Sequence, residues 1–546
     1  MLFSKLQKII FTSVFQSFTI YASVMPIAHT DQLFQLIKSL DKAEKRNFKL
    51  YVKRLESNKD PLFLKVFEVL DKMEVLDENT LSQKLAEISS TNLINIKRHL
   101  YAQIITSLRL IHNKKEVRLQ IREHIDYAEI LYGKGLYLQA LKILDKAKII
   151  AEKANQDLLL FEVLEFEKLI ESRHITRSRQ VENKVEWLID QSQLKKEHLS
   201  NASDLLNLNL KIHGFYIKKG HVRTELDRFI LRDYFYSNLR NISKKPQGFF
   251  EKVYLHQAYM WYYYTCLELP WCYRHSKKWV DTFIQKPYMK TKDPDLLMRG
   301  LHYLLTSAFY MKHRDAFRKY FRIFEDFHEH YHSTFNATSQ LTYFIYGWNA
   351  RINNHFLKGE FTEVVDMIPE IEKELHHFDH VLDKHRRITF YYKISWALIA
   401  VGDYNQAIDY INRIFEFEQS KLRNEVLCYI RILQLIAHHH LGHHEWVHNT
   451  IPSVVRYFKV YQESNPVQKE VTKLLSSFKS TGHFYKESQL KNLKNKLELI
   501  FKDPLQRRPF IYFNFIDWIR AIENQTTIEM IVKKDYSDYL DNKLYK

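Results

Sequence analysis

Apolar side chains recur at helical spacing along most of the chain, most clearly from Leu131 to Ala154 (LYGKGLYLQALKILDKAKIIAEKA). This spacing predicts two helices with Gly135 between them, where a glycine allows the chain to reverse. Two antiparallel helices also need small residues where their backbones approach and large ones to fill the remaining gap. The positions that meet this need are Ala128, Leu131, Tyr137, Ala140, Leu144 and Ala147.

A shorter form of the same pattern returns three times. It consists of a glycine, a large residue two positions later, and a small or branched residue three positions after that. The copies are GEFTEV from Gly359, GDYNQA from Gly402 and GHHEWV from Gly442, with glycines 43 and 40 residues apart. HRDAFRKYF, around Ala316, fits a further copy without its glycine. Helix pairs repeated in this way cannot bury their faces alone, so the pattern predicts an all-α stacked solenoid.

The Leu131–Ala154 hairpin resembles a tetratricopeptide (TPR) repeat, and the later copies resemble it more loosely. Their spacing exceeds the about 34 residues of a standard repeat, which longer helices or loops would explain. The resemblance implies an α-solenoid of antiparallel helix pairs whose first helices line a concave groove for a protein or peptide. By register it implies these groove residues: Arg122, Glu129, Tyr132, Tyr346, Asn349, Asn353, Tyr392, Trp396 and His439.

We expect the repeats to be flanked by helical caps. We predict an N-terminal helical cap over residues 25–115 and TPR-like repeats over residues 116–250. Degenerate repeats are predicted over residues 251–460, and a C-terminal helical cap over residues 461–546. Asp41 and Glu44 have the spacing of a capping box at the start of a helix. A DNA-binding helix-turn-helix is the alternative for the first block, but that block lacks a tight glycine turn.

The first 24 residues differ in composition. Lys5 and Lys8 precede an apolar run, as in a signal peptide, but polar residues interrupt it and no clear cleavage site follows. The run is also short and polar for a membrane span. We favour an over-extended reading frame with the true start at Met25, and a cytoplasmic protein without a stable membrane span. Envelope targeting is the alternative if residues 1–24 are a real signal.

Composition supports long helices joined by short loops. The 546 residues include 11 Gly and 11 Pro, each about 2% where about 7% and 5% are usual. Strands and turns depend on these residues for reversals, so their scarcity disfavours β structure. The three cysteines, Cys266, Cys272 and Cys428, are too few for a disulfide framework. We expect buried or idle thiols in a reducing compartment.

The chain is basic, with 82 Lys and Arg against 64 Asp and Glu and a formal net charge of +18. Such a charge attracts nucleic acid, which binds with a steep dependence on salt. The charges are interleaved along the chain, however, and we find no long basic run. A mixed-charge helical surface is the preferred interpretation, and a basic groove that binds nucleic acid is the alternative.

HEWVH, from His444 to His448, matches the zinc-hydrolase motif HExxH. Gly442 predicts a turn just before it, so the motif would begin a helix rather than lie within one. The neighbourhood is rich in histidine, and no third ligand is evident beyond Glu463 or Glu470. His444 and His448 are therefore weak metal candidates, and a zinc hydrolase is the less favoured alternative. We expect no cofactor and no catalysis, because phosphate-binding, dinucleotide-binding and nucleophile-elbow motifs are also missing.

Overall fold

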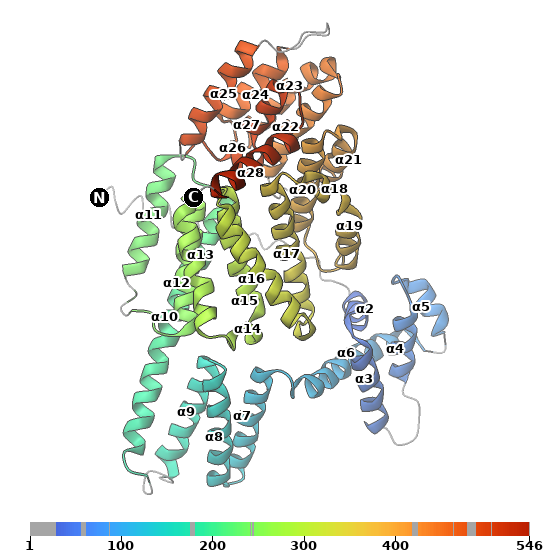
Figure 1. The fold of residues 1–546 in the computed structure, drawn as a ribbon. Coiled ribbons are helices and arrows are strands. Elements are labelled where there is room, and N and C mark those ends of the chain that lie inside the picture. Colours follow the sequence, from blue (N-terminus) through green and yellow to red (C-terminus); the bar gives the residue numbers. More distant parts are fainter. Residues whose placement is uncertain are drawn as a thin grey trace, which may run out of the picture. The chain divides into compact units, whose positions relative to one another are not determined.

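The computed structural model describes residues 29–544 except 56–61, 87, 175–180, 241, 243–244, 418–423, 462, 478–486 and 504. Over these ranges the chain forms 27 α-helices and a short 3-10 helix, with no strand (Figure 1). The all-α prediction is confirmed. Within the same ranges, no helix has both the length and the apolar character needed to cross a bilayer. The predicted N-terminal segment 1–24 and the start at Met25 lie outside the described residues.

The chain divides into two compact units, residues 1–195 and 196–546. The boundary falls within α10 (Lys184–Lys219), a helix of 36 residues without a proline to interrupt it. The predicted repeat segment 116–250 therefore contributes to both units. The predicted boundary at residue 250 lies inside the second unit, where α11 (Glu225–Arg240) is followed by α12 (Phe249–Thr265).

The first unit begins with five helices around a small core. They are α2 (His29–Ser39), α3 (Lys42–Leu55), α4 (Leu62–Lys72), α5 (Glu78–Lys84) and α6 (Ser90–His112). Phe48 and Phe67 are fully buried between them. The predicted capping box is present, because the Glu44 N–H donates to Asp41 Oδ1 at 2.7 Å and the Asp41 N–H donates to Glu44 Oε2 at 2.9 Å.

The clearest sequence repeat forms the predicted helical hairpin. It consists of α7 (Val117–Gly133) and α8 (Tyr137–Lys153), followed by α9 (Asp157–His174). Ala128, Ala140 and Leu144 are fully buried between the helices. Gly135 has φ +75°, in the left-handed region. The N–H of the next residue donates to the carbonyl of Leu131 at 3.0 Å, as is typical of a helix that ends in a left-handed residue.

The second unit stacks helix pairs in chain order. The pairs are α12 with α13 (Leu269–Gln285), α15 (Pro294–Tyr310) with α16 (Arg314–Tyr331), α17 (Ala337–Lys358) with α18 (Phe361–Asp366) and α19 (Ile368–His377), α20 (Lys384–Val401) with α21 (Tyr404–Phe415), and α22 (Asn424–His440) with α23 (His444–Val460). The first helices α15, α17, α20 and α22 pack against one another in sequence. Each pair thus buries its faces against its neighbours, as a helical repeat requires.

One turn geometry joins the helices of these pairs. Gly359, Gly402 and Gly442 all have positive φ, and Leu267 at +58° and Lys312 at +51° adopt the same region without being glycine. The following N–H bonds the carbonyl five residues back, for example at 2.8 Å after Lys312 and at 2.9 Å after Gly402. The segment around Ala316, which lacks the glycine, is therefore preceded by the same turn geometry as the other copies. A non-glycine residue here costs about 1–2 kcal/mol.

The C-terminal helices fold back onto the stack. They are α24 (Pro466–Ser476), α25 (Glu487–Lys502), α26 (Pro509–Tyr512), α27 (Phe515–Glu523) and α28 (Ile528–Leu544). Helices α24 and α26 pack on α22, and α28 packs on both α17 and α20. The predicted cap is therefore not only a terminal layer, because it also covers helices from the middle of the stack.

Candidate binding cavities

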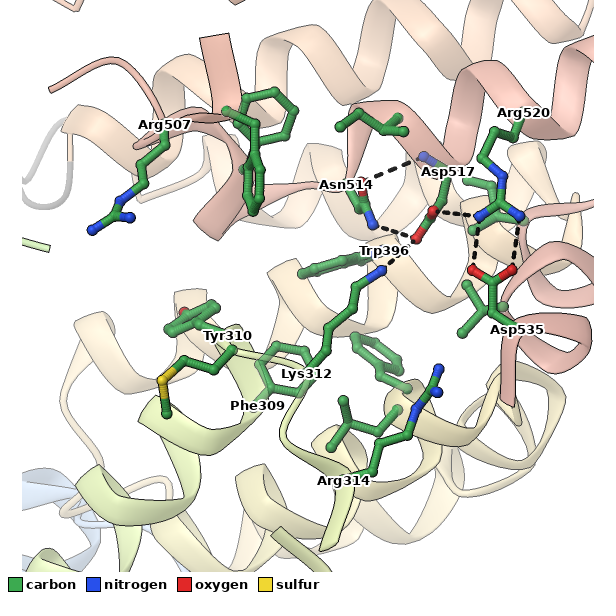
Figure 2. A pocket seen from close by; sticks show the side chains of 18 of the residues that line it. Phe309, Tyr310, Lys312, Arg314, Trp396, Arg507, Asn514, Asp517, Arg520 and Asp535 are labelled. Atoms are coloured by element: carbon green, nitrogen blue, oxygen red, sulfur yellow. Dashed lines mark hydrogen bonds and ion pairs between the residues drawn. The ribbon is translucent and has the colours of Figure 1, made fainter. Parts of the chain in front are cut away.

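A cavity of about 710 Å³ lies in the second unit between the stack and the C-terminal helices (Figure 2). Its volume falls within the range of about 300–1,000 Å³ typical of ligand sites. Most of its wall is apolar. The stack contributes Phe309, Leu357, Phe361 and Trp396, and α28 contributes Ile528 and Val532.

Charged side chains from opposite sides of this cavity pair across it. Lys312, from the turn before α16, places Nζ 3.5 Å from Asp517 Oδ2 on α27. Arg520, also on α27, forms two bonds of 2.7 Å with the carboxylate of Asp535 on α28. These hydrogen bonds from Arg520 lower the pKa of Asp535, although burial opposes the effect. The ion pairs thus link the stack, α27 and α28 at the cavity (Figure 2).

A second, smaller cavity of about 90 Å³ lies where several first helices converge. Lys393 and Asn353 line it, and no carboxylate from the described part of the chain does. Five tyrosines complete much of its wall: Tyr216, Tyr264, Tyr310, Tyr392 and Tyr512. Phe309, Tyr310 and Trp396 line both cavities. The two cavities therefore share an aromatic partition.

Lys393 bonds only neutral groups. Its Nζ donates to the carbonyl of Asn349 at 3.4 Å and to Oδ1 of Asn353. The ammonium also lies 6.0 Å from the centre of the Phe309 ring. Removal of the charge from water lowers the pKa of Lys393 to about 7. The lysine is half-protonated near neutral pH as a result.

Positive charge extends from Lys393 along the first helices. His302 on α15 stacks on Tyr346 of α17 at 4.3 Å between ring centres, and Arg386 donates to the Tyr346 hydroxyl at 3.2 Å. Burial holds the pKa of His302 well below its usual value, and the charges of Arg386, Lys393 and Arg299 lower it further. Every charge that acts noticeably on this histidine is positive.

The predicted groove residues separate into two groups. On α7 of the first unit, Arg122 and Glu129 are exposed and Tyr132 is half-buried, with its hydroxyl accepting a bond of 3.1 Å from Arg173. In the second unit six are buried, with exposed fractions of 3–9%: Tyr346, Asn349, Asn353, Tyr392, Trp396 and His439. With so little exposed surface, these six side chains do not form an open docking face.

The structure brings three of these residues together at the small cavity, namely Asn353, Tyr392 and Trp396. Tyr346, Asn349 and His439 line neither of these two cavities. Sequence reasoning missed Lys393, although it directly follows Tyr392 and lies three residues before Trp396 on the same helix. It also missed Asp517, Arg520 and Asp535, since the repeat pattern contains no information about where the C-terminal helices pack.

The histidines around HEWVH have structural partners. His444 begins α23, as Gly442 predicts, and His448 is exposed. His440 stacks on Tyr404 at 4.6 Å and its Nε2 accepts a bond of 3.1 Å from Trp518. Burial lowers the pKa of His439 to about 3 and that of His440 to about 4. Among the described residues, no three His, Cys, Asp or Glu side chains are grouped to hold a metal ion.

Comparison with known proteins gave no match to any family model, to any curated protein or to any solved structure. The function is therefore inferred from the residues of this chain and their geometry.

Proposed function

We propose that this chain is a non-catalytic, TPR-like scaffold that binds a segment of a partner protein in the large cavity of its second unit. The observation that carries the proposal is the cavity of about 710 Å³ beside the helix-pair turns. Its lining combines Trp396 and Tyr310 with Arg314 and Arg520. Tryptophan, tyrosine and arginine are the residues that most often dominate the energy of protein interfaces. An apolar side chain of the partner would occupy the cavity, and the charged pairs at its edge would orient the segment.

Phe501 and Leu499 provide a matched test on one helix. Both lie on α25 with large exposed fractions, 48% and 67%, so neither substitution disturbs the core. Only Phe501 lines the cavity. We expect Phe501→Asp to lose a partner that wild type and Leu499→Asp both capture from cells. A partner retained equally by all three proteins would contradict binding at this cavity.

Nucleic acid is the second candidate partner. The cationic side chains Arg299, Arg386 and Lys393 near stacked aromatic rings favour it, as does the net charge of +18. Capture at two salt concentrations separates the candidates, because affinity for nucleic acid falls steeply as salt rises. If nuclease destroys the captured ligand, the partner is nucleic acid and not a protein.

We also propose that the protein works in a reducing compartment such as the cytoplasm. The support is that Cys266, Cys272 and Cys428 are all free and buried, whereas extracellular domains more often pair their cysteines. Fractionation of the native cells with an antibody to the chain tests this assignment. Recovery of the chain outside the cytoplasm would contradict it.

A further inference from the structure

The small cavity contains an ammonium group and no acid to balance it. Lys393 donates to a backbone carbonyl and to the side-chain oxygen of Asn353, both neutral. Among the residues that the structure describes, no Asp or Glu lines the cavity. A buried cation without a counter-ion is unfavourable, and a carboxylate within reach would replace that cost with a charge-assisted hydrogen bond.

We propose that this cavity binds the carboxylate of an organic acid with an apolar body, with Lys393 as its counter-ion. The acid is either a small free molecule or the acidic end of a bound peptide segment. In the second case the proposal deepens the proposed function and rests on it. Asn353 positions the ammonium, and the aromatic partition receives the apolar part of the ligand.

The dimensions favour a small anionic group. A cavity needs about 10–15 Å³ to hold one water molecule, so about 90 Å³ accommodates a carboxylate and a few further atoms. Phe309, Tyr310 and Trp396 separate this space from the large cavity. An apolar group attached to the carboxylate therefore meets aromatic rings in either direction.

Binding is coupled to protonation of Lys393. Burial lowers the pKa of Lys393 to about 7 when no ligand is bound. A bound carboxylate raises this pKa. The acid should therefore bring more protons with it at pH 8 than at pH 6. The other titratable groups around the ammonium are His221, the five tyrosines of the wall, His302, and Arg386, which lies seven residues before Lys393 on α20.

Calorimetry with butyrate and its uncharged amide tests the site. The wild-type chain is titrated at pH 6 and pH 8 in two buffers of different ionisation enthalpy, which counts the protons taken up. We expect the acid to bind at least about tenfold tighter than the amide. Equal binding of the two, or no binding of the acid at millimolar concentration, overturns the proposal.

Three variants of α20 complete the test. Lys393→Met should remove both the preference for the acid and the proton uptake, whereas Lys393→Arg should keep the preference. Lys384→Met, at the exposed start of the same helix, should behave as wild type. Unchanged acid binding by Lys393→Met also overturns the site. Thermal unfolding of each variant confirms that its fold is intact.

The two proposals fail separately. If the acid binds as expected while Phe501→Asp still captures every partner, the carboxylate site stands and the protein-binding cavity is rejected. If Phe501→Asp loses its partner while the acid and amide bind equally, the protein-binding cavity stands and the carboxylate site is rejected.

Discussion

Gly359 and Lys533 are in backbone contact across the second unit. A Cβ atom at Gly359 would lie 2.3 Å from the amide nitrogen of Lys533 and 2.7 Å from its Cα. Gly359 also has φ +76°, which the turn between α17 and α18 requires. This one glycine therefore serves both a repeat turn and the packing of the C-terminal helix α28.

Alanine substitutions at three glycines should separate these two roles. Gly133 has ordinary helical geometry and open space around it, so Gly133→Ala should stabilise the first unit by up to about 1 kcal/mol. Gly135 has φ +75° and the same open space, so Gly135→Ala should destabilise by about 1 kcal/mol. Gly359→Ala should destabilise by more, because it adds a clash with backbone. Denaturant unfolding followed for each unit measures the order.

Hydrogen exchange provides a local readout for Gly359→Ala. The clash is with Val532 and Lys533, so amides of α28 should exchange faster in this variant and those of α8 should not change. Uniformly faster exchange throughout the second unit would instead indicate that the substitution disrupts the whole stack.

The Arg520–Asp535 pair should hold α28 with a defined pH dependence. Hydrogen bonds from Arg520 lower the pKa of Asp535 below 3.8, so the pair stabilises the fold at pH values above the unfolded pKa. That contribution disappears as pH falls through the folded pKa. We expect Asp535→Asn to cost about 1 kcal/mol at pH 7, given the partial exposure of the pair. The difference from wild type should shrink as the pH approaches 3.

Lys393 should destabilise the fold most at low pH. Its pKa is about 7 in the folded chain, against 10.5 for an ordinary lysine in water, so the unfolded state binds the extra proton between these values. Stability attributable to this residue therefore rises from pH 7 to about pH 10. Lys393→Met should stabilise the second unit at pH 6 by one to a few kcal/mol, and by less at pH 10. A constant difference across this range would contradict burial of the charge.

Glu463 accepts two arginines from distant parts of the chain. Arg223 Nη2 lies 2.5 Å and Arg508 Nη1 2.8 Å from its carboxylate, and the side chains of Glu463 and Arg508 are almost fully buried. Glu463→Gln leaves Arg508 without a buried counter-ion, so we expect a loss of about 3–5 kcal/mol. Glu470→Gln is the control, since its pair with Lys496 is partly exposed and should contribute less than about 1 kcal/mol.

The cysteines should resist thiol reagents in the folded chain. Cys272 has no exposed surface, and burial raises the pKa of Cys266 and Cys272 to about 12. Only the thiolate reacts quickly. Ellman's reagent at pH 8 should therefore detect almost no thiol until denaturant is added, and then three. Rapid reaction of one thiol in the native protein would place it at an accessible surface.

Much of the local architecture could be predicted because it depends on nearby residues. The glycine pattern located the turns at Gly135, Gly359, Gly402 and Gly442, since only a few backbone conformations can end one helix and start the next. The turns at Leu267 and Lys312 carry no glycine, and packing of the flanking helices holds their unfavourable φ. The sequence pattern around Ala316 indicated the turn at Lys312, but no pattern indicated the turn at Leu267.

The sequence by itself determined that this chain is helical, that its helices pair, and where most of the pairs turn, because helical periodicity and turn chemistry act over a few residues. Only the tertiary structure decided that α28 packs on α17 and α20, that six of the nine predicted groove residues are buried, and that no acidic side chain of the described ranges lines the cavity of Lys393. These features depend on side chains distant in the sequence, and a periodic pattern shows which face of a helix is apolar but not which distant segment covers it.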